Sequence, residues 1–254
     1  MDLGGQRPEQ GNDGARLATH GVDSDQTRRV LRWTYLGRVA YQSALELQID
    51  SREQLRQGRA DERLILLQHP HTYTLGRSAD RGEILAGSEW LAARGVTIAE
   101  SDRGGQVTYH GPGQLVGYPI INLDPDRRDI RRYMHDLQEV LVRTLAVFGL
   151  AAEARHEQPE IGVWCAGRKV ASLGVHISRW ITTHGFALNV ATDLSYFSGI
   201  VPCGMPRVEM ASIESLTGSA PEIEHVALAC VECFCDVFDR QPQPIRPEEL
   251  ASPT

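Results

Sequence analysis

The stretch RGGQVTYHGPGQLVGYPIINL, residues 103–123, joins a glycine-rich loop to the apolar run of a buried strand. Its first half holds Gly104, Gly105, Gly111 and Gly113, which allow backbone conformations closed to other residues and let a ligand approach the main chain. Polar side chains of Arg, Gln, Tyr and His stand between these glycines. Glycines taken singly also favour a tight hairpin. So many polar groups on a loop that leads into a strand favour instead the wall of a binding site.

The overall composition indicates a globular protein of the cytoplasm. A net charge of −7 at pH 7 argues against a general nucleic-acid binder, because phosphate contacts need a surplus of Lys and Arg on one face. No apolar run reaches the length of a membrane span, and the N-terminus has no secretion signal. The five cysteines are an odd number in a long chain, which is typical of reduced thiols. We therefore expect a cytoplasmic protein with no nucleic-acid partner and no membrane association.

Apolar periodicity predicts a single α+β domain over residues 29–240. Helices are expected at 40–57, 90–94, 130–148 and 219–237, the last opened by a capping box at Ser219–Glu222. Strands are expected at 30–36, 63–68, 72–75, 96–100, 115–122, 161–164, 169–177 and 181–190. Because these elements show no regular βαβ alternation, they favour a mixed or antiparallel central sheet with packed helices over a doubly wound parallel sheet.

The two ends of the chain differ from this domain in composition. Residues 1–28 have little apolar content, so burial cannot offset the entropy of ordering them, and they predict a flexible leader. Residues 241–254 are rich in Pro and Glu and predict a flexible tail.

Four arginines gather at the start of the helix predicted over 130–148. Arg127, Arg128, Arg131 and Arg132 are spaced so that they can share one flank of its first turns. Such a run is typical of a solvated helix face. The alternative is a docking patch for an acidic protein, which would attract it despite the negative overall charge.

Most of the histidines and cysteines are best interpreted as structural. His69 and His71 have no second His/Cys pair at ligand spacing nearby, so we expect no metal site. Cys230 and Cys233 form a C-x-x-C pattern on the last predicted helix, with no preceding strand and no partner pair. We interpret both as small apolar side chains.

Cys203 is different, because it lies between Pro202 and Gly204 in a segment with no helical pattern. The proline fixes the approach of the backbone and the glycine clears space beside the sulfur, an arrangement that can present a thiol to a pocket. A nucleophilic cysteine also needs a group that accepts its proton or stabilises the thiolate. The chain offers several candidates, and spacing alone does not choose among His110, His176, His184 and Lys169.

Over residues 30–240 the chain resembles the octanoyltransferase family, the lipoyl(octanoyl) transferases of lipoate biosynthesis. Four blocks carry the resemblance: RGGQVTYHGPGQ at 103–114, GRKVASLG at 167–174, THGFALN at 183–189 and VPCG at 201–204. The resemblance implies a catalytic domain like that of biotin and lipoate protein ligases, with no cofactor. It also implies a catalytic dyad of Cys203 and Lys169. The acyl-binding positions that it implies are Arg103, Gly104, Gly105, Gln106, Val107, Thr108, Tyr109, His110, Ser172, Leu173, Gly174, Gly185, Phe186 and Ala187.

The reaction implied by the resemblance passes through a thioester on Cys203. The donor would be octanoyl-acyl carrier protein, and the acceptors would be lysines of the lipoyl domains of 2-oxoacid dehydrogenase complexes and of the glycine cleavage H protein. Two other functions fit parts of the pattern. An ATP-dependent lipoate or biotin ligase also modifies a carrier lysine but needs no nucleophilic thiol, and a non-catalytic carrier-binding protein would keep the pocket without using the dyad.

Overall fold

The computed structural model of the protein describes residues 1–2 and 28–250. Nearly all of the predicted leader therefore lies outside the described residues, as do residues 251–254. No helix in the described part of the chain is long and apolar enough to cross a membrane.

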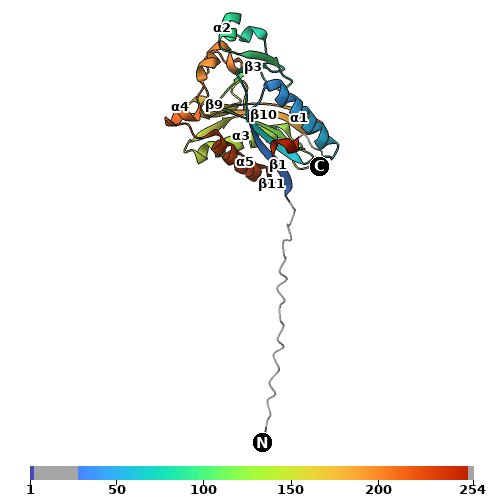
Figure 1. Ribbon diagram of the computed structural model, residues 1–254. Helices are drawn as coiled ribbons and strands as arrows, with labels where there is room; N and C mark the ends of the chain where they lie inside the picture. Colours follow the sequence, from blue (N-terminus) through green and yellow to red (C-terminus); the bar gives the residue numbers. More distant parts are fainter. Residues whose placement is uncertain (3–27, 251–254) are drawn as a thin grey trace.

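An eight-stranded sheet forms the centre of the molecule (Figure 1). Its strand order is β11-β1-β2-β6-β10-β9-β8-β7. The pairs β1–β2 and β1–β11 are parallel and the other pairs are antiparallel, so the predicted mixed sheet is confirmed. The strands are β1 (Arg29–Arg38), β2 (Glu62–Gln68), β6 (Gln114–Ile120), β7 (Ala152–Arg155), β8 (Gly162–Cys165), β9 (Arg168–Ser178), β10 (Ile181–Asn189) and β11 (Arg240–Pro244).

A second sheet of three strands has the order β4-β3-β5, with β3 (Thr72–Leu75), β4 (Thr97–Glu100) and β5 (Val107–His110). The stretch at 103–123 therefore supplies strands to both sheets, and β5 and β6 do not form a hairpin. Gly113 lies in the turn between them with φ +77°, and a Cβ there would stand 2.3 Å from the Ala191 carbonyl oxygen. Glycine is needed at this position because the turn passes directly over the chain that follows β10.

Helices cover both faces of the large sheet. On one face α3 (Ile130–Val147) and α5 (Ile223–Phe238) share an apolar core with the sheet, and on the other face α1 (Tyr41–Arg56) packs on a smaller core (Figure 1). A third apolar cluster lies between the small sheet, the short helix α2 (Ser88–Ala93) and the 3₁₀ segment η2 (Leu194–Gly199). The short elements that remain are α4 (Ile213–Thr217) and the 3₁₀ turns η1 (Arg81–Glu83), η3 (Pro202–Gly204) and η4 (Pro247–Leu250).

The predicted capping box at Ser219–Glu222 is wrong. Glu222 is the N-cap of α5, and its side chain makes no capping hydrogen bond. The capping box lies instead at the start of α4, where Ser212 and Ser215 exchange side-chain and backbone hydrogen bonds. The sequence prediction missed α4 because a five-residue helix has too few turns to show a periodic apolar face.

The prediction of a flexible tail is also wrong for residues 241–250. Residues 240–244 form β11, which pairs in parallel with β1, and Ile245 and Leu250 are buried in the core beside α1. At the start of β11 the Arg240 guanidinium lies 2.6 Å from a carboxylate oxygen of Glu62, and both side chains are buried. The prolines of β11 are tolerated because β11 is an edge strand with an exposed side.

The four arginines before and within α3 do not share one surface. Arg127 is buried: it bonds Asp136 and donates to the Val237 carbonyl oxygen over a distance of 2.7 Å. Arg128, Arg131 and Arg132 are exposed. A docking patch would therefore consist of these three residues, because Arg127 fastens the start of α3 to the end of α5.

Candidate active site

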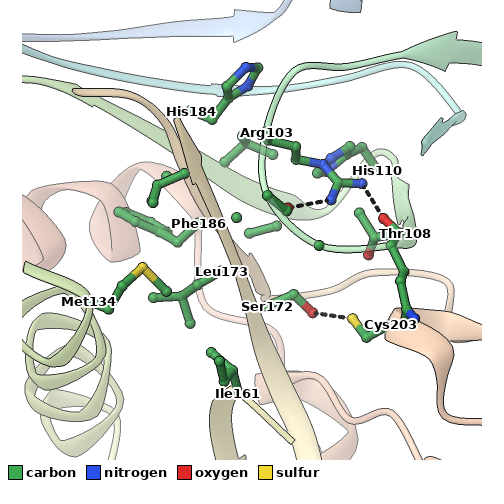
Figure 2. A pocket seen from close by; sticks show the side chains of 18 of the residues that line it. Arg103, Thr108, His110, Met134, Ile161, Ser172, Leu173, His184, Phe186 and Cys203 are labelled. Carbon is green, nitrogen blue, oxygen red and sulfur yellow. Dashed lines mark hydrogen bonds between the residues drawn. The ribbon is translucent and has the colours of Figure 1, made fainter. Parts of the chain in front are cut away.

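A cavity of about 270 Å³ opens between the loop before β5 and the hairpin of β9 and β10 (Figure 2). Its walls come from segments that are far apart in the sequence, and Cys203 stands at one end of it. The volume lies near the lower end of the range for small-ligand pockets. Besides Cys203 and the predicted acyl-binding residues, the cavity is lined by Tyr41, Ser78, Val116, Tyr118, Met134, Gln158, Pro159, Ile161, Val175 and His184.

All the predicted acyl-binding residues line this cavity except Val107 and Tyr109. Successive side chains of a strand point to opposite faces, so Thr108 and His110 of β5 face the cavity while Val107 and Tyr109 face away. Those two lie in the third apolar cluster, where the Tyr109 hydroxyl is 2.8 Å from Nδ1 of His71. The alternation rule could have separated the two pairs from the sequence once the stretch was assigned as a strand.

Arg103 is a buried cation at the cavity wall. Its guanidinium donates to the Thr74 hydroxyl and carbonyl oxygens over 2.7 and 2.8 Å, and to the Gln106 carbonyl oxygen over 2.9 Å. Its Nε is buried without a hydrogen-bond partner, and no carboxylate in the described part of the chain forms an ion pair with it. Burial lowers the pKa of Arg103, and the neighbouring Tyr41 acts in the opposite direction. The site thus holds a positive charge that forms no ion pair with any of the described carboxylates.

Cys203 occupies an unusual backbone conformation for a residue with a side chain. Its φ is +53°, and the following Gly204 is also left-handed with φ +70°. A Cβ on Gly204 would lie 1.9 Å from Oε1 of Gln106, so the space expected beside the cysteine is filled by this amide. The Cys203 sulfur is half-buried and lies 3.9 Å from the Ser172 hydroxyl (Figure 2). Left-handed conformations in non-glycine residues cluster at functional sites, where the surrounding fold holds them.

Lys169 on β9 is fully buried, with only 1% of its surface exposed, which excludes the solvated lysine typical of a strand end. Its Nζ donates to the Ile161 carbonyl oxygen over 2.8 Å and lies 5.8 Å from the centre of the Trp164 ring. A Cβ on Gly162 would stand 2.5 Å from Cε of Lys169, so glycine makes room for the lysine side chain. No hydrogen bond between Lys169 and Cys203 is present in the described part of the chain.

A bulge in β9 nevertheless turns Lys169 towards the side of the sheet where Ser172 lies. The adjacent residues Val163 and Trp164 of β8 pair with Ala171 and Lys169 of β9. Val170, which lies between the two, is therefore the additional residue of the bulge. Val170 and Ala171 both lie in the core beside α3. Without the bulge, residues 169 and 172 would point to opposite faces. Ile161, whose carbonyl oxygen accepts from Lys169, also lines the cavity.

The remaining histidine candidates are engaged with other groups. Asp102 accepts from Nε2 of His184 over 2.6 Å and also bonds Nδ1 of His176. His110 pairs through Nδ1 with Oε1 of Gln114 over 2.8 Å, and burial holds the pKa of His110 well below its usual range. Figure 2 shows His184 and Cys203 at opposite ends of the cavity. Asp102 has no sequence signal of its own, because its partners come from distant strands.

A comparison with protein families finds that residues 40–235 match the Lipoyl protein ligase A/B catalytic domain. The chain is 45% identical over 224 residues to an octanoyltransferase of Myxococcus xanthus, covering 85% of this chain and 63% of that protein. It is 45% identical over 206 residues to an octanoyltransferase of Solibacter usitatus, covering 80% of this chain and 91% of that protein.

Two solved structures resemble the fold at low sequence identity. A bipartite lipoate protein ligase from Thermoplasma acidophilum aligns with a TM-score of 0.66 and 18% identity, covering 88% of this chain and 90% of that chain. Lipoate-protein ligase A bound with ATP aligns with a TM-score of 0.66 and 17% identity, covering 88% and 92%. These alignments show that the predicted α+β fold is that of the lipoate protein ligases.

Proposed function

Since the chain belongs to the lipoyl protein ligase A/B catalytic-domain family, among its octanoyltransferases, we propose that it transfers an octanoyl group. The donor in this proposal is octanoyl-acyl carrier protein, and the group is transferred to a lysine of apo lipoyl domains. The acceptors in this proposal are the lipoyl domains of 2-oxoacid dehydrogenase complexes and the glycine cleavage H protein. The observation that carries the proposal is the half-buried Cys203 thiol at one end of a cavity that also has an apolar side, formed by Leu173, Phe186 and Met134.

In the first half-reaction Lys169 acts as the base. Its amine takes the proton of the Cys203 thiol, and the thiolate attacks the carbonyl carbon of the octanoyl thioester. The carbon–sulfur bond to the pantetheine arm of the donor breaks, and protonated Lys169 gives its proton to that departing sulfur. This step requires Nζ of Lys169 to leave the Ile161 carbonyl oxygen. Hydrogen bonds between catalytic groups often tighten only when substrate is bound, so we expect Lys169 to contact Cys203 in the complex with the donor.

In the second half-reaction the acceptor lysine attacks the thioester on Cys203. Its amine loses a proton to Lys169 as the amide bond forms, and the Cys203 sulfur leaves and recovers a proton from Lys169. The acyl group is already activated as a thioester, so the transfer needs no ATP.

Both half-reactions place negative charge on the thioester oxygen and on sulfur. Arg103 supports a role in stabilising that charge, because it is a buried cation that forms no ion pair among the described residues and it lines the same cavity as Cys203. Backbone N–H groups beside Cys203 and the neighbouring amide of Gln106 are further candidates for the oxyanion site.

The test is to incubate the protein with octanoyl-acyl carrier protein in the absence of ATP and to measure the intact mass. An octanoyl adduct is expected on the wild-type protein and on Cys233→Ala, which removes another half-buried thiol, but not on Cys203→Ala. Adding an apo lipoyl domain should discharge the adduct. An adduct that persists in Cys203→Ala would refute the proposed nucleophile. Transfer that requires ATP and free octanoate would identify a ligase, and binding of both carriers without transfer would identify a non-catalytic carrier-binding protein.

A further inference from the structure

One side of the cavity is lined by apolar side chains. Cys203 lies beside Ser172 and Thr108, whereas Leu173, Phe186 and Met134 lie on the side of the cavity away from Cys203 (Figure 2). A thioester bound to Cys203 would leave its alkyl chain to occupy the apolar side, since burial of methylene groups is favourable there.

The apolar side extends around an open edge of β9. Strand β8 pairs with β9 only as far as Ala171, so the outer edge of β9 is free of β8 beyond that residue. Leu173 and Phe186 pack with the core beside α3, whereas Val116 and Ala187, which also line the cavity, lie in the core beside α1. The cavity therefore reaches from the sheet face that carries α1 towards the face that carries α3.

Met134 stands where the cavity meets α3. It is the only residue of α3 that lines the cavity, and Figure 2 shows it on the far side of Leu173 from Cys203. Methionine is unbranched and has three rotatable bonds, so it can fill a gap of variable length. The cavity is small, and an acyl chain longer than the space allows would have to displace this side chain.

We propose that Met134 is the far wall of the acyl site and sets the longest chain that the enzyme accepts. This inference depends on the proposed acyl transfer through Cys203. Truncation of Met134 to alanine opens space beyond the end of the chain, and substitution by phenylalanine fills it. Each additional methylene buried in the opened space favours the longer acyl group by about fourfold, the equivalent of ~0.8 kcal/mol.

The experiment is a competition among equimolar hexanoyl, octanoyl, decanoyl and dodecanoyl thioesters of acyl carrier protein, read as the mass distribution of adducts on Cys203. Relative to the wild type, Met134→Ala should raise the decanoyl-to-octanoyl ratio about fifteenfold, because two methylenes gain room. Met134→Phe should shift the distribution towards hexanoyl. The matched control is Ile130→Ala, which truncates an exposed apolar residue one turn earlier on the same helix and should leave the distribution unchanged.

A folded Met134→Ala protein whose adduct ratios stay within twofold of the wild type would overturn the inference. If that variant does not fold, Met134→Phe decides alone, because its expected shift has the opposite sign. If the wild-type protein forms no adduct on Cys203, the proposed function fails. The role of Met134 is then tested by binding of free octanoate and decanoate, for which equal affinity ratios in the wild type and the variants would overturn it.

Discussion

Replacing Lys169 by methionine separates the chemistry of the site from its packing. Methionine is close to lysine in length, so it can occupy the narrow space over Gly162 while removing the amine. Without its base, the protein should form the Cys203 adduct ~10²–10⁴-fold more slowly, which corresponds to about 3–5 kcal/mol in the activation barrier.

The effect of Lys169→Met on stability should be much smaller than its effect on rate. The substitution leaves the Ile161 carbonyl oxygen without its donor, and an unsatisfied buried group costs about 1–3 kcal/mol. It also removes a buried amine, whose desolvation is unfavourable, and this offsets part of that loss. We therefore expect a free energy of unfolding within about 2 kcal/mol of the wild type.

The assay is single-turnover formation of the octanoyl adduct, followed by intact mass under quench, with urea unfolding measured on the same samples. Arg168→Met is the matched control, since it removes a cationic side chain at the adjacent position of β9 and should retain the wild-type rate. A folded Lys169→Met protein that forms the adduct within about fivefold of the wild-type rate would refute the role of Lys169 as the base, given the ~10²–10⁴ expected.

Three further predictions concern pH, the backbone at Cys203 and the surface of α3. Burial lowers the pKa of His69 from 6.5 to about 4. The neutral histidine therefore contributes stability that is present above pH 6.5 and is lost as the pH falls towards 4. The loss in the free energy of unfolding, measured in urea, should approach about 3 kcal/mol and should be absent in His69→Gln. In Gly204→Ala the added Cβ would meet the Gln106 amide, and the alanine would have to adopt a left-handed φ. Adduct formation should therefore slow at least tenfold while the melting curve stays cooperative. An unchanged rate would contradict the need for this turn. Reversing the exposed Arg131 and Arg132 to glutamate should raise the KM for octanoyl-acyl carrier protein and weaken its dependence on salt, whereas unchanged values would show a solvated helix face.

Local patterns predicted most of the elements that position the site. The strands at 63–68 and 72–75 and the long helix at 130–148 agree with β2, β3 and α3 to within one residue, because each has a clear apolar period or a clear stop signal. The glycine-rich loop was also correctly assigned to the wall of a cavity.

Features that depend on long-range packing could not be predicted. The separation of β5 and β6 into two sheets depends on partners at β3 and β2, which the local pattern does not contain. The edge strand β11 is stabilised by β1 and by the ion pair of Arg240 with Glu62, although its own sequence disfavours a strand. The hydrogen bond of Lys169 to Ile161 likewise joins residues whose proximity is created by the turn between β8 and β9.

The loop before β5 has a further consequence for the behaviour of the protein in solution. Its Gly104 N–H donates to the Val175 carbonyl oxygen over 2.9 Å, on the side of β9 that β8 leaves open. Unpaired backbone groups on a strand edge are templates for pairing with another chain, and proteins protect such edges to avoid aggregation. Loop deletions made to admit larger substrates would therefore also expose a self-associating edge. Redesign of the acyl site should therefore begin with residues of α3, because changes there leave the loop in place over the edge of β9.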